Sequence, residues 1–130
     1  MAWPDNRADM NGLHLTADLR DCPSTTTAMT DVDALRALCL DAVRAAGLTS
    51  VGELFHRFPG AGGGTGVVLL AESHLAVHTW PELNAVTLDV YVCNFGADNT
   101  TRAHTLMNHL QAHFSPGRTE RHALHRGSAA

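Results

Sequence analysis

One short segment of the chain combines side chains that could carry out acyl chemistry. It holds a hydroxyl nucleophile, Ser73, beside two imidazoles, His74 and His78, and two carboxylates, Glu72 and Glu82. A serine hydroxyl can attack the carbonyl carbon of the preceding residue, here Glu72, and convert that amide into an ester. Such a shift needs a strained bend at the serine and hydrogen-bond donors for the developing oxyanion. Because a buried apolar strand precedes this segment, we expect Ser73 at a strand end or a tight bend.

The ester could become a carbonyl group if a base removed the proton on the Cα atom of Ser73. Elimination would release the Glu72 carboxylate and leave dehydroalanine, and hydrolysis would turn that residue into a pyruvoyl group at a new N-terminus. His78 is suited to proton transfer near neutral pH. The residues alone favour an ordinary serine at a strand end, so self-cleavage stands here as a hypothesis.

The basic residues restrict the choice of electrophile. All nine are arginine, and the chain contains no lysine. A lysine Schiff base, including that of pyridoxal phosphate enzymes, is therefore impossible. Any carbonyl chemistry must use another electrophile.

The composition is that of an ordinary globular chain. Its 130 residues are enough for one domain, with 45% hydrophobic residues, 17% charged residues and a pI near 6.1. No basic patch indicates a nucleic-acid partner. We find neither an apolar run long enough to span a membrane nor a secretory signal, so we expect a cytoplasmic protein with no membrane partner.

The positions of the three cysteines in the sequence predict different environments for their thiols. Cys22, Cys39 and Cys93 are an odd number without CxxC spacing, which argues against a disulfide framework and a structural zinc site. Cys39 lies on the apolar stripe of a predicted helix and is expected in the core. Cys93 ends a strand on its polar side, where a thiol can exchange a proton, although the residues alone favour a packed cysteine.

Hydrophobic periodicity predicts an α+β domain. Residues 12–20 alternate strictly, as in a half-buried strand. The predicted order is strand, helix, several strands, helix, strand, with helices from residue 30 or 31 to 46 and from 98 or 99 to 114, and strands near 12–20, 51–58, 66–80 with a bend, 87–93 and 118–125. This pattern favours a two-layer sandwich, in which two helices cover one face of a mainly antiparallel sheet.

The remaining segments and the other face of the sheet complete this prediction. Residues 1–11 are expected to form a flexible tail, and the glycine-rich segment 59–64 to form a flexible connection that could cover a site. The sheet face without helices would carry His14, Asp18, Asp89 and Cys93. Such a polar face must be covered or functional.

Two other kinds of site use the same residues. His74 and His78 could approach one metal ion, with His56 or Glu72 as a further ligand, but no third ligand is tied to them by spacing, and we predict no metal. A hydrolase triad of Ser73, His78 and Asp89 has the right residue types. It lacks the Gly-x-Ser-x-Gly elbow, since a glutamate and a histidine flank the serine.

The segment from Glu72 to Glu82, ESHLAVHTWPE, resembles the self-processing segment of the small prokaryotic S-adenosylmethionine decarboxylases, a pyruvoyl-dependent family. The likeness extends upstream to FHRF at 55–58 and downstream to TLDVYVC at 87–93, and it covers roughly residues 12–127. It implies one self-processing domain over 12–127, cut between Glu72 and Ser73 into a β chain of residues 1–72 and an α chain of residues 73–130.

The resemblance also implies a role for each site residue. Ser73 would become the pyruvoyl group, the cofactor that forms a Schiff base with the substrate amine, and His78 would transfer the proton during processing. Cys93 would donate the proton that replaces carbon dioxide. Phe58 would stack on the adenine of the substrate, and Glu82 would hold the ribose hydroxyls. The product, decarboxylated S-adenosylmethionine, serves spermidine and polyamine synthesis.

In that family, small chains form a two-fold dimer that places residues of both subunits around each site, so we expect a homodimer of processed protomers that takes a small-molecule substrate. This chain departs from the familiar pattern twice. Thr65 replaces an expected serine, which could slow processing, and the thiol lies in the sequence VCNF, residues 92–95, instead of Thr-Cys-Gly.

The second departure leaves the choice of substrate open. A pyruvoyl-dependent ornithine or arginine decarboxylase is the nearest alternative, with Asp18, Asp89 or Glu53 pairing with the distal cation. An uncleaved binding module or a metal-dependent enzyme is the more distant one.

Overall fold

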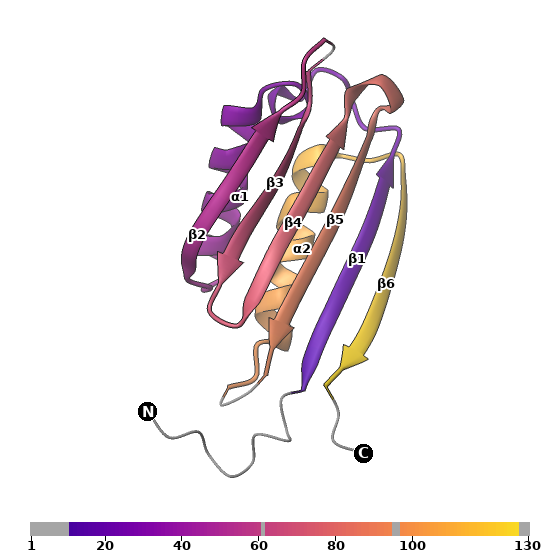
Figure 1. Ribbon diagram of the computed structural model, residues 1–130. Helices are drawn as coiled ribbons and strands as arrows, with labels where there is room; N and C mark the ends of the chain where they lie inside the picture. The colour runs from indigo at the N-terminus through magenta and orange to yellow at the C-terminus, as the bar shows by residue number, and fades with distance from the viewer. Residues whose placement is uncertain (1–10, 61, 95–96, 128–130) are drawn as a thin grey trace.

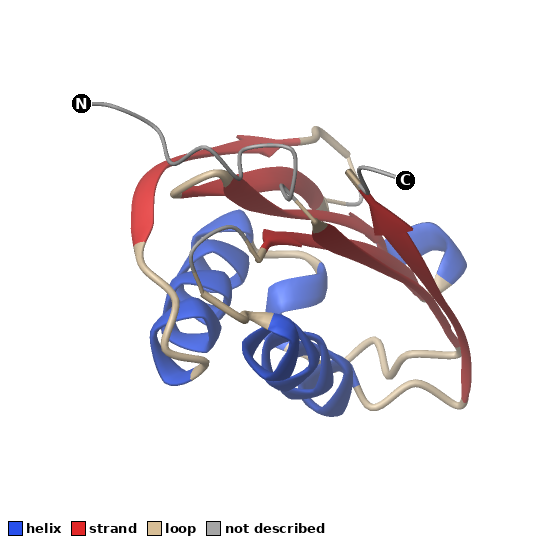
Figure 2. Cartoon of the chain, turned by 90° about the horizontal axis from the view of Figure 1, so that it is seen from below, coloured by secondary structure: helices blue, strands red, loops and turns tan. Residues whose placement is uncertain are grey.

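The computed structural model describes residues 11–60, 62–94 and 97–127 (Figure 1). These residues form two layers, a curved antiparallel sheet and a pair of helices on one of its faces, as Figure 2 shows from below. The strands are β1 (Gly12–Arg20), β2 (Ser50–Arg57), β3 (Gly64–Leu70), β4 (Ser73–Trp80), β5 (Ala85–Cys93) and β6 (Arg118–Arg126), and the α-helices are α1 (Val32–Ala45) and α2 (Thr100–Phe114). The predicted α+β sandwich is confirmed.

The strands lie in the order β2-β3-β4-β5-β1-β6, and neighbouring strands in this sheet are antiparallel. The first strand of the chain is therefore placed between β5 and β6, far from its sequence neighbours. Hairpins join β2 to β3, β3 to β4 and β4 to β5. This arrangement brings the β3–β4 turn, the end of β5, the start of β1 and the end of β6 to one edge of the molecule, at the bottom of Figure 1.

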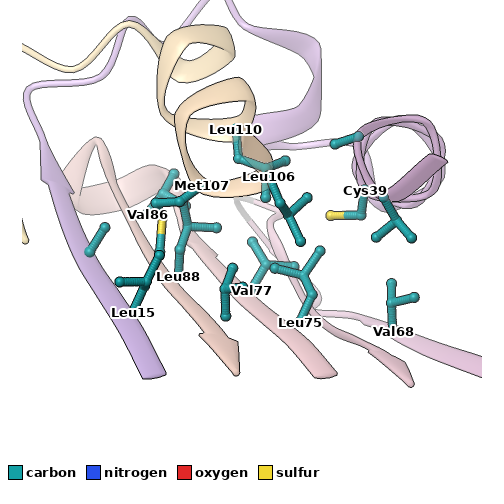
Figure 3. Packing of buried hydrophobic residues seen from close by; sticks show 14 of the residues in the cluster. Leu15, Cys39, Val68, Leu75, Val77, Val86, Leu88, Leu106, Met107 and Leu110 are labelled. Atoms are coloured by element: carbon teal, nitrogen blue, oxygen red, sulfur yellow. The ribbon is translucent and has the colours of Figure 1, made fainter. Parts of the chain in front are cut away.

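The core lies between the sheet and the helices. Helix α1 begins after Asp31, whose carboxylate accepts hydrogen bonds from the backbone N–H groups of Asp33 and Ala34. Helix α2 lies at the predicted place, and its buried stripe consists of Ala103, Leu106, Met107, Leu110 and Phe114. Figure 3 shows Leu106, Met107 and Leu110 packed over Val86 and Leu88 of the sheet, with Cys39 of α1 beside them. Cys39 is a core residue as predicted, and burial raises the pKa of its thiol to about 12.

Some element boundaries differ from the sequence prediction. Strand β3 begins at Gly64, two residues earlier than expected, because it pairs with β2 as far as Arg57. Gly62 and Gly63 before it have positive φ, and a Cβ at Gly63 would collide with the ring of Pro81, so close packing requires glycine there. Strand β6 extends to Arg126, a residue expected in the C-terminal tail. The predicted tail, residues 1–11, lies outside the described residues except for Asn11.

The sheet face opposite the helices, called the open face below, has no second layer within the described part of the chain. Directly opposed residues on neighbouring strands share a face. The register therefore places three rows of side chains on the open face, namely His56, Thr65, His78, Thr87, Asp18 and Glu120, then Leu54, Val67, Ala76, Asp89, Thr16 and His122, then Leu69, His74, Tyr91, His14 and Leu124. None of the helices that the structure describes is long and apolar enough to cross a membrane.

Candidate active site

The predicted bend at Ser73 is present. Ala71 and Glu72 form the turn between β3 and β4, and Glu72 has φ of +59°. This left-handed conformation costs an ordinary L-residue about 1–2 kcal/mol. The peptide bond between Glu72 and Ser73 therefore lies where the backbone is strained, as the acyl shift requires.

Ser73 is held against the end of β5. Its hydroxyl oxygen accepts a hydrogen bond of 3.0 Å from the backbone N–H of Cys93. Cys93 in turn is fixed from the other side, because the side-chain amide of Asn99 donates a hydrogen bond of 3.0 Å to its carbonyl oxygen. The structure thus brings together Ser73 and Cys93, which are twenty residues apart in the chain. We call the group of Glu72, Ser73 and Cys93 the serine end of the sheet.

The thiol of Cys93 is half-buried and unpaired. By strand alternation it belongs to the open face, with Tyr91 and Asp89. The neighbouring Asn94 donates its backbone N–H to the carbonyl oxygen of Asn11, at 2.7 Å, which closes the end of the sheet. Phe95, the last residue of the departure noted around the thiol, lies outside the described residues.

The other predicted site residues line a pocket of about 400 Å³ at the opposite end of β4. Phe58 and Trp80 supply aromatic faces, and Glu82 supplies a carboxylate from the short helix η3 (Pro81–Leu83). Phe58 is 43% exposed. Roles for Phe58 and Glu82 were expected from the sequence, whereas Trp80 is a pocket residue for which no role was expected.

His78 lies in the same pocket and is oriented by the residue opposite it on β3. The hydroxyl of Thr65 and Nδ1 of His78 are 2.9 Å apart and share a hydrogen bond. Thr65 thus keeps the contact that a serine would make. We call the group of Phe58, Thr65, His78, Trp80 and Glu82 the pocket end.

Within one chain, the structure does not bring Ser73 and His78 together. Both belong to β4, five residues apart, and a strand rises about 3.3 Å per residue, so their Cα atoms are separated by roughly 16 Å. Figure 1 shows this separation as the distance between the β3–β4 turn and the far end of β4. His78 therefore cannot take the Cα proton of Ser73 of its own chain, and a Ser73–His78–Asp89 triad is excluded for the same reason.

A further cluster of ionisable groups lies on the open face next to the serine end. Nε2 of His14 and Oδ1 of Asp89 are 2.9 Å apart. The ring of His74 lies 6.4 Å from that of His14 and 5.7 Å from that of Tyr91. Burial lowers the pKa of His74, and the neighbouring His14 lowers it further. Sequence reasoning placed His14 and Asp89 on this face, but only the register reveals that they are in contact.

The carboxylates considered for a cationic amino-acid substrate are scattered. Glu53 lies on the helix side, where its carboxylate accepts hydrogen bonds of 2.6–3.0 Å from Arg36. Asp89 is paired with His14, and Asp18 lies near Arg20 and Arg118. Among the described residues, no three His, Cys, Asp or Glu side chains gather so that they could hold a metal ion.

Comparison with known proteins agrees with this geometry. The sequence pattern of the family described as S-adenosylmethionine decarboxylase matches residues 13–127. The S-adenosylmethionine decarboxylase proenzyme of Aquifex aeolicus is 36% identical over 116 residues, which are 89% of this chain and 81% of that protein. The proenzyme of the same name from Persephonella marina is 37% identical over 90% of this chain and 83% of its own length.

A solved structure has the same fold. The crystal structure of the adenosylmethionine decarboxylase from Aquifex aeolicus superimposes with a TM-score of 0.79 at 34% identity, covering 88% of this chain and 89% of that chain. The sequence match, the sheet order and the strained bond before Ser73 agree. The chain belongs to the S-adenosylmethionine decarboxylase family and is a decarboxylase.

Proposed function

We propose that the chain cuts itself between Glu72 and Ser73 and then decarboxylates S-adenosylmethionine with a pyruvoyl group made from Ser73. The observation that carries this proposal is the strained turn at Glu72, beside which the backbone N–H of Cys93 holds the Ser73 hydroxyl. The product would be the aminopropyl donor of polyamine synthesis. A reduced cytoplasm suits the free thiol of Cys93.

The residues present fit a pyruvoyl group. The chain has no lysine and therefore cannot anchor pyridoxal phosphate, another source of an imine-forming carbonyl, as a lysine Schiff base. The Ser73 oxygen attacks the carbonyl carbon of Glu72, and the bond between that carbon and the Ser73 nitrogen breaks, which exchanges an amide for an ester. Removal of the Cα proton then expels the Glu72 carboxylate. Addition of water and loss of ammonia leave the ketone. An oxygen from water replaces the serine nitrogen and the hydroxyl oxygen leaves with Glu72, while Cα and Cβ of residue 73 stay at the start of β4, next to the end of β5.

The pyruvoyl carbonyl supplies the electron sink for the bond that breaks when carbon dioxide leaves. The chain's own residues then complete the reaction. Cys93 lies next to residue 73 and can donate a proton from its thiol to the carbon that lost carbon dioxide. Because the Cys93 backbone and side chain have separate roles in this proposal, cleavage and decarboxylation are separable by mutation.

The base for processing comes, in this proposal, from a second chain. A two-fold axis in the plane between two open faces, perpendicular to the strands, would bring the serine end of each chain against the pocket end of the other. The open face suits such pairing, since it lacks a covering layer in the described residues and exposes Leu54, Leu69 and Leu124 at 73%, 49% and 58%. The resulting assembly contains two copies of each fragment.

The pocket end suits the nucleoside part of the substrate. Phe58 and Trp80 can stack on adenine, and their faces also attract the sulfonium cation. Glu82 can accept hydrogen bonds from the two ribose hydroxyls. For ornithine or arginine these aromatic faces would have no ring to stack on, and Glu53 is already bound to Arg36. S-adenosylmethionine is therefore the substrate that this pocket favours.

The test is the intact mass of freshly purified protein under denaturing conditions. We expect two fragments of 72 and 58 residues, the smaller with a blocked N-terminus that borohydride reduces. The Ser73→Ala variant should remain one chain of 13.9 kDa. A wild-type chain that stays whole after long incubation would contradict the proposal. Carbon dioxide release from S-adenosylmethionine, ornithine and arginine in parallel then identifies the substrate.

A further inference from the structure

Arg126, the last residue of β6, reaches across the sheet to the serine end. Strand pairing aligns Cys93, Gly12 and Arg126 in one row across β5, β1 and β6. At about 4.8 Å per strand, the backbones of Cys93 and Arg126 are roughly 10 Å apart. The Arg126 side chain extends from β6 towards β5, since its guanidinium carbon lies 5.3 Å from the centre of the Tyr91 ring.

Gly12 makes this crossing possible. A Cβ at Gly12 would collide with the phenol oxygen and ring of Tyr91, so the ring lies directly over the bare backbone of β1. Tyr91 thereby forms a flat support between β6 and Cys93, and a guanidinium stacks well on such a face. The position of the Arg126 side chain therefore depends on the Tyr91 ring of β5 and on the absence of a side chain at Gly12 of β1.

The charges around this guanidinium leave it available to an anion. Within the described residues, no carboxylate oxygen lies within 4.0 Å of Arg126. The carboxylate in its vicinity is Asp89, which is bound to His14 at 2.9 Å. Arg126 also lies close enough to His74 to help lower the pKa of that imidazole, after burial and His14. Among the described residues, the Arg126 guanidinium therefore has no carboxylate at ion-pair distance on the open face.

We propose that Arg126, supported by Tyr91, binds the α-carboxylate of the substrate and so determines that the site takes amino acids rather than amines. This inference rests on the proposed function. The substrate's amine must react at residue 73, so its carboxylate, one carbon away, lies within reach of a guanidinium over Tyr91. A planar guanidinium can donate two parallel hydrogen bonds to a carboxylate.

Arg126 would contribute to substrate binding, and the chemistry predicts which bound state it stabilises most. The carboxylate loses its charge as carbon dioxide departs, so Arg126 stabilises the bound substrate more than the transition state. The product has no carboxylate and gains nothing from Arg126. Loss of the guanidinium should therefore raise KM without lowering kcat, and should leave product binding unchanged.

The experiment compares wild type, Arg126→Gln, Arg126→Lys and Arg44→Gln after self-cleavage. Arg44 is the matched control, an exposed arginine on the helix layer that is paired with Asp41. For each protein we would confirm cleavage by mass, measure KM and kcat for S-adenosylmethionine, and measure the Kd of the decarboxylated product by calorimetry.

We expect Arg126→Gln to raise KM about tenfold to a hundredfold, with kcat within about threefold of wild type and the product Kd within about twofold. The KM of Arg126→Lys should lie between those of wild type and Arg126→Gln, because lysine keeps the charge but lacks the planar pair of donors. Arg44→Gln should match wild type. An unchanged KM, or a product Kd that weakens as much as KM, would overturn the inference. An uncleaved wild-type chain would instead contradict the proposed function itself.

Discussion

The two ends of β4 differ in what each can do alone. In the proposed mechanism, the serine end supplies the bond to be cut, the hydroxyl that attacks it and the thiol of the later step, and contacts within the chain hold Ser73 and the Cys93 backbone. The pocket end has an oriented imidazole and, in the proposal, the place for the nucleoside. A strand of eight residues separates the two ends. Under the proposed function, the site would be complete only where two chains meet.

The sharpest test of this division mixes two inactive variants. Ser73→Ala and His78→Ala chains should each stay whole when expressed alone. When they are expressed together at equal levels, random pairing puts half of the chains in mixed dimers, each with one site that has both residues. We expect about half of the His78→Ala chains to be cut, as measured by mass. No cleavage in the mixture would show that the two ends do not meet in this way.

A second test separates the two steps within the serine end. Cys93→Ala keeps the backbone N–H that binds the Ser73 hydroxyl, so cleavage should proceed, while decarboxylation should fall about a hundredfold to ten-thousandfold. Cys39→Ala is the matched control, since that thiol is buried in the core far from the reaction. It should reduce thermal stability and leave turnover per cleaved chain unchanged. Equal effects on cleavage and turnover at Cys93 would argue against a separate role for the thiol.

A third test concerns substrate binding at the pocket end. Phe58→Leu should raise KM about three- to tenfold through loss of stacking, with cleavage unaffected. Val51→Ala, which shortens an apolar side chain that is 66% exposed on β2, the strand that ends just before Phe58, provides the control. If both variants had the same KM as wild type, the pocket would not be the nucleoside site.

A fourth test concerns the orientation of His78. Thr65→Val removes the hydrogen bond to Nδ1 at nearly constant shape and should slow cleavage about two- to tenfold. Thr65→Ser keeps the hydroxyl and removes the methyl group, so cleavage should be as fast as in wild type or faster. The time course of fragment appearance in freshly synthesised protein measures both. A valine variant that matches wild type would show that the contact does not matter.

The smallest expected effect is on stability near the serine end. Since the folded protein lowers the pKa of His74 below its ordinary value of 6.5, the unfolded chain binds a proton more readily. Stability should therefore fall as the pH drops through 6.5 towards the lowered value. In an uncleavable Ser73→Ala background, His74→Gln should reduce the loss of Tm between pH 7.5 and pH 5.5. An unchanged pH dependence would assign that loss to other groups.

Local patterns were sufficient to predict the layers of this fold. The alternation of β1 and the stripe of α2 are periodic features of single segments, and the structure buries one face of each. The bend at Ser73 followed from a buried run that ends beside it. These features depend on neighbours in the chain, which a sequence displays directly.

The contacts between distant segments could not be predicted in the same way. The hydrogen bonds of Ser73 with Cys93 and of Thr65 with His78 depend on strand register, as does the pairing of His14 with Asp89. The sequence predicted that the last strand ends at residue 125, because a single arginine after it adds no periodic signal. The alignment of Arg126 with Gly12 and Cys93 appears only once β1 is placed between β5 and β6.

That insertion also bears on the proposed cut between Glu72 and Ser73, because it determines how the two pieces would hold together. If residues 1–72 and 73–130 become separate pieces, the first contributes β1, β2 and β3 and the second β4, β5 and β6. Strands of the two pieces would then be interleaved in one sheet, in which β1 of the first piece pairs with both β5 and β6 of the second. The two pieces would be interlocked, because separating them requires breaking three strand pairings, β3 with β4, β5 with β1 and β1 with β6. This sheet would form before the cut, while the two pieces are still one chain. We therefore expect the cleaved protein, once fully denatured, to refold less readily than the uncut precursor folds.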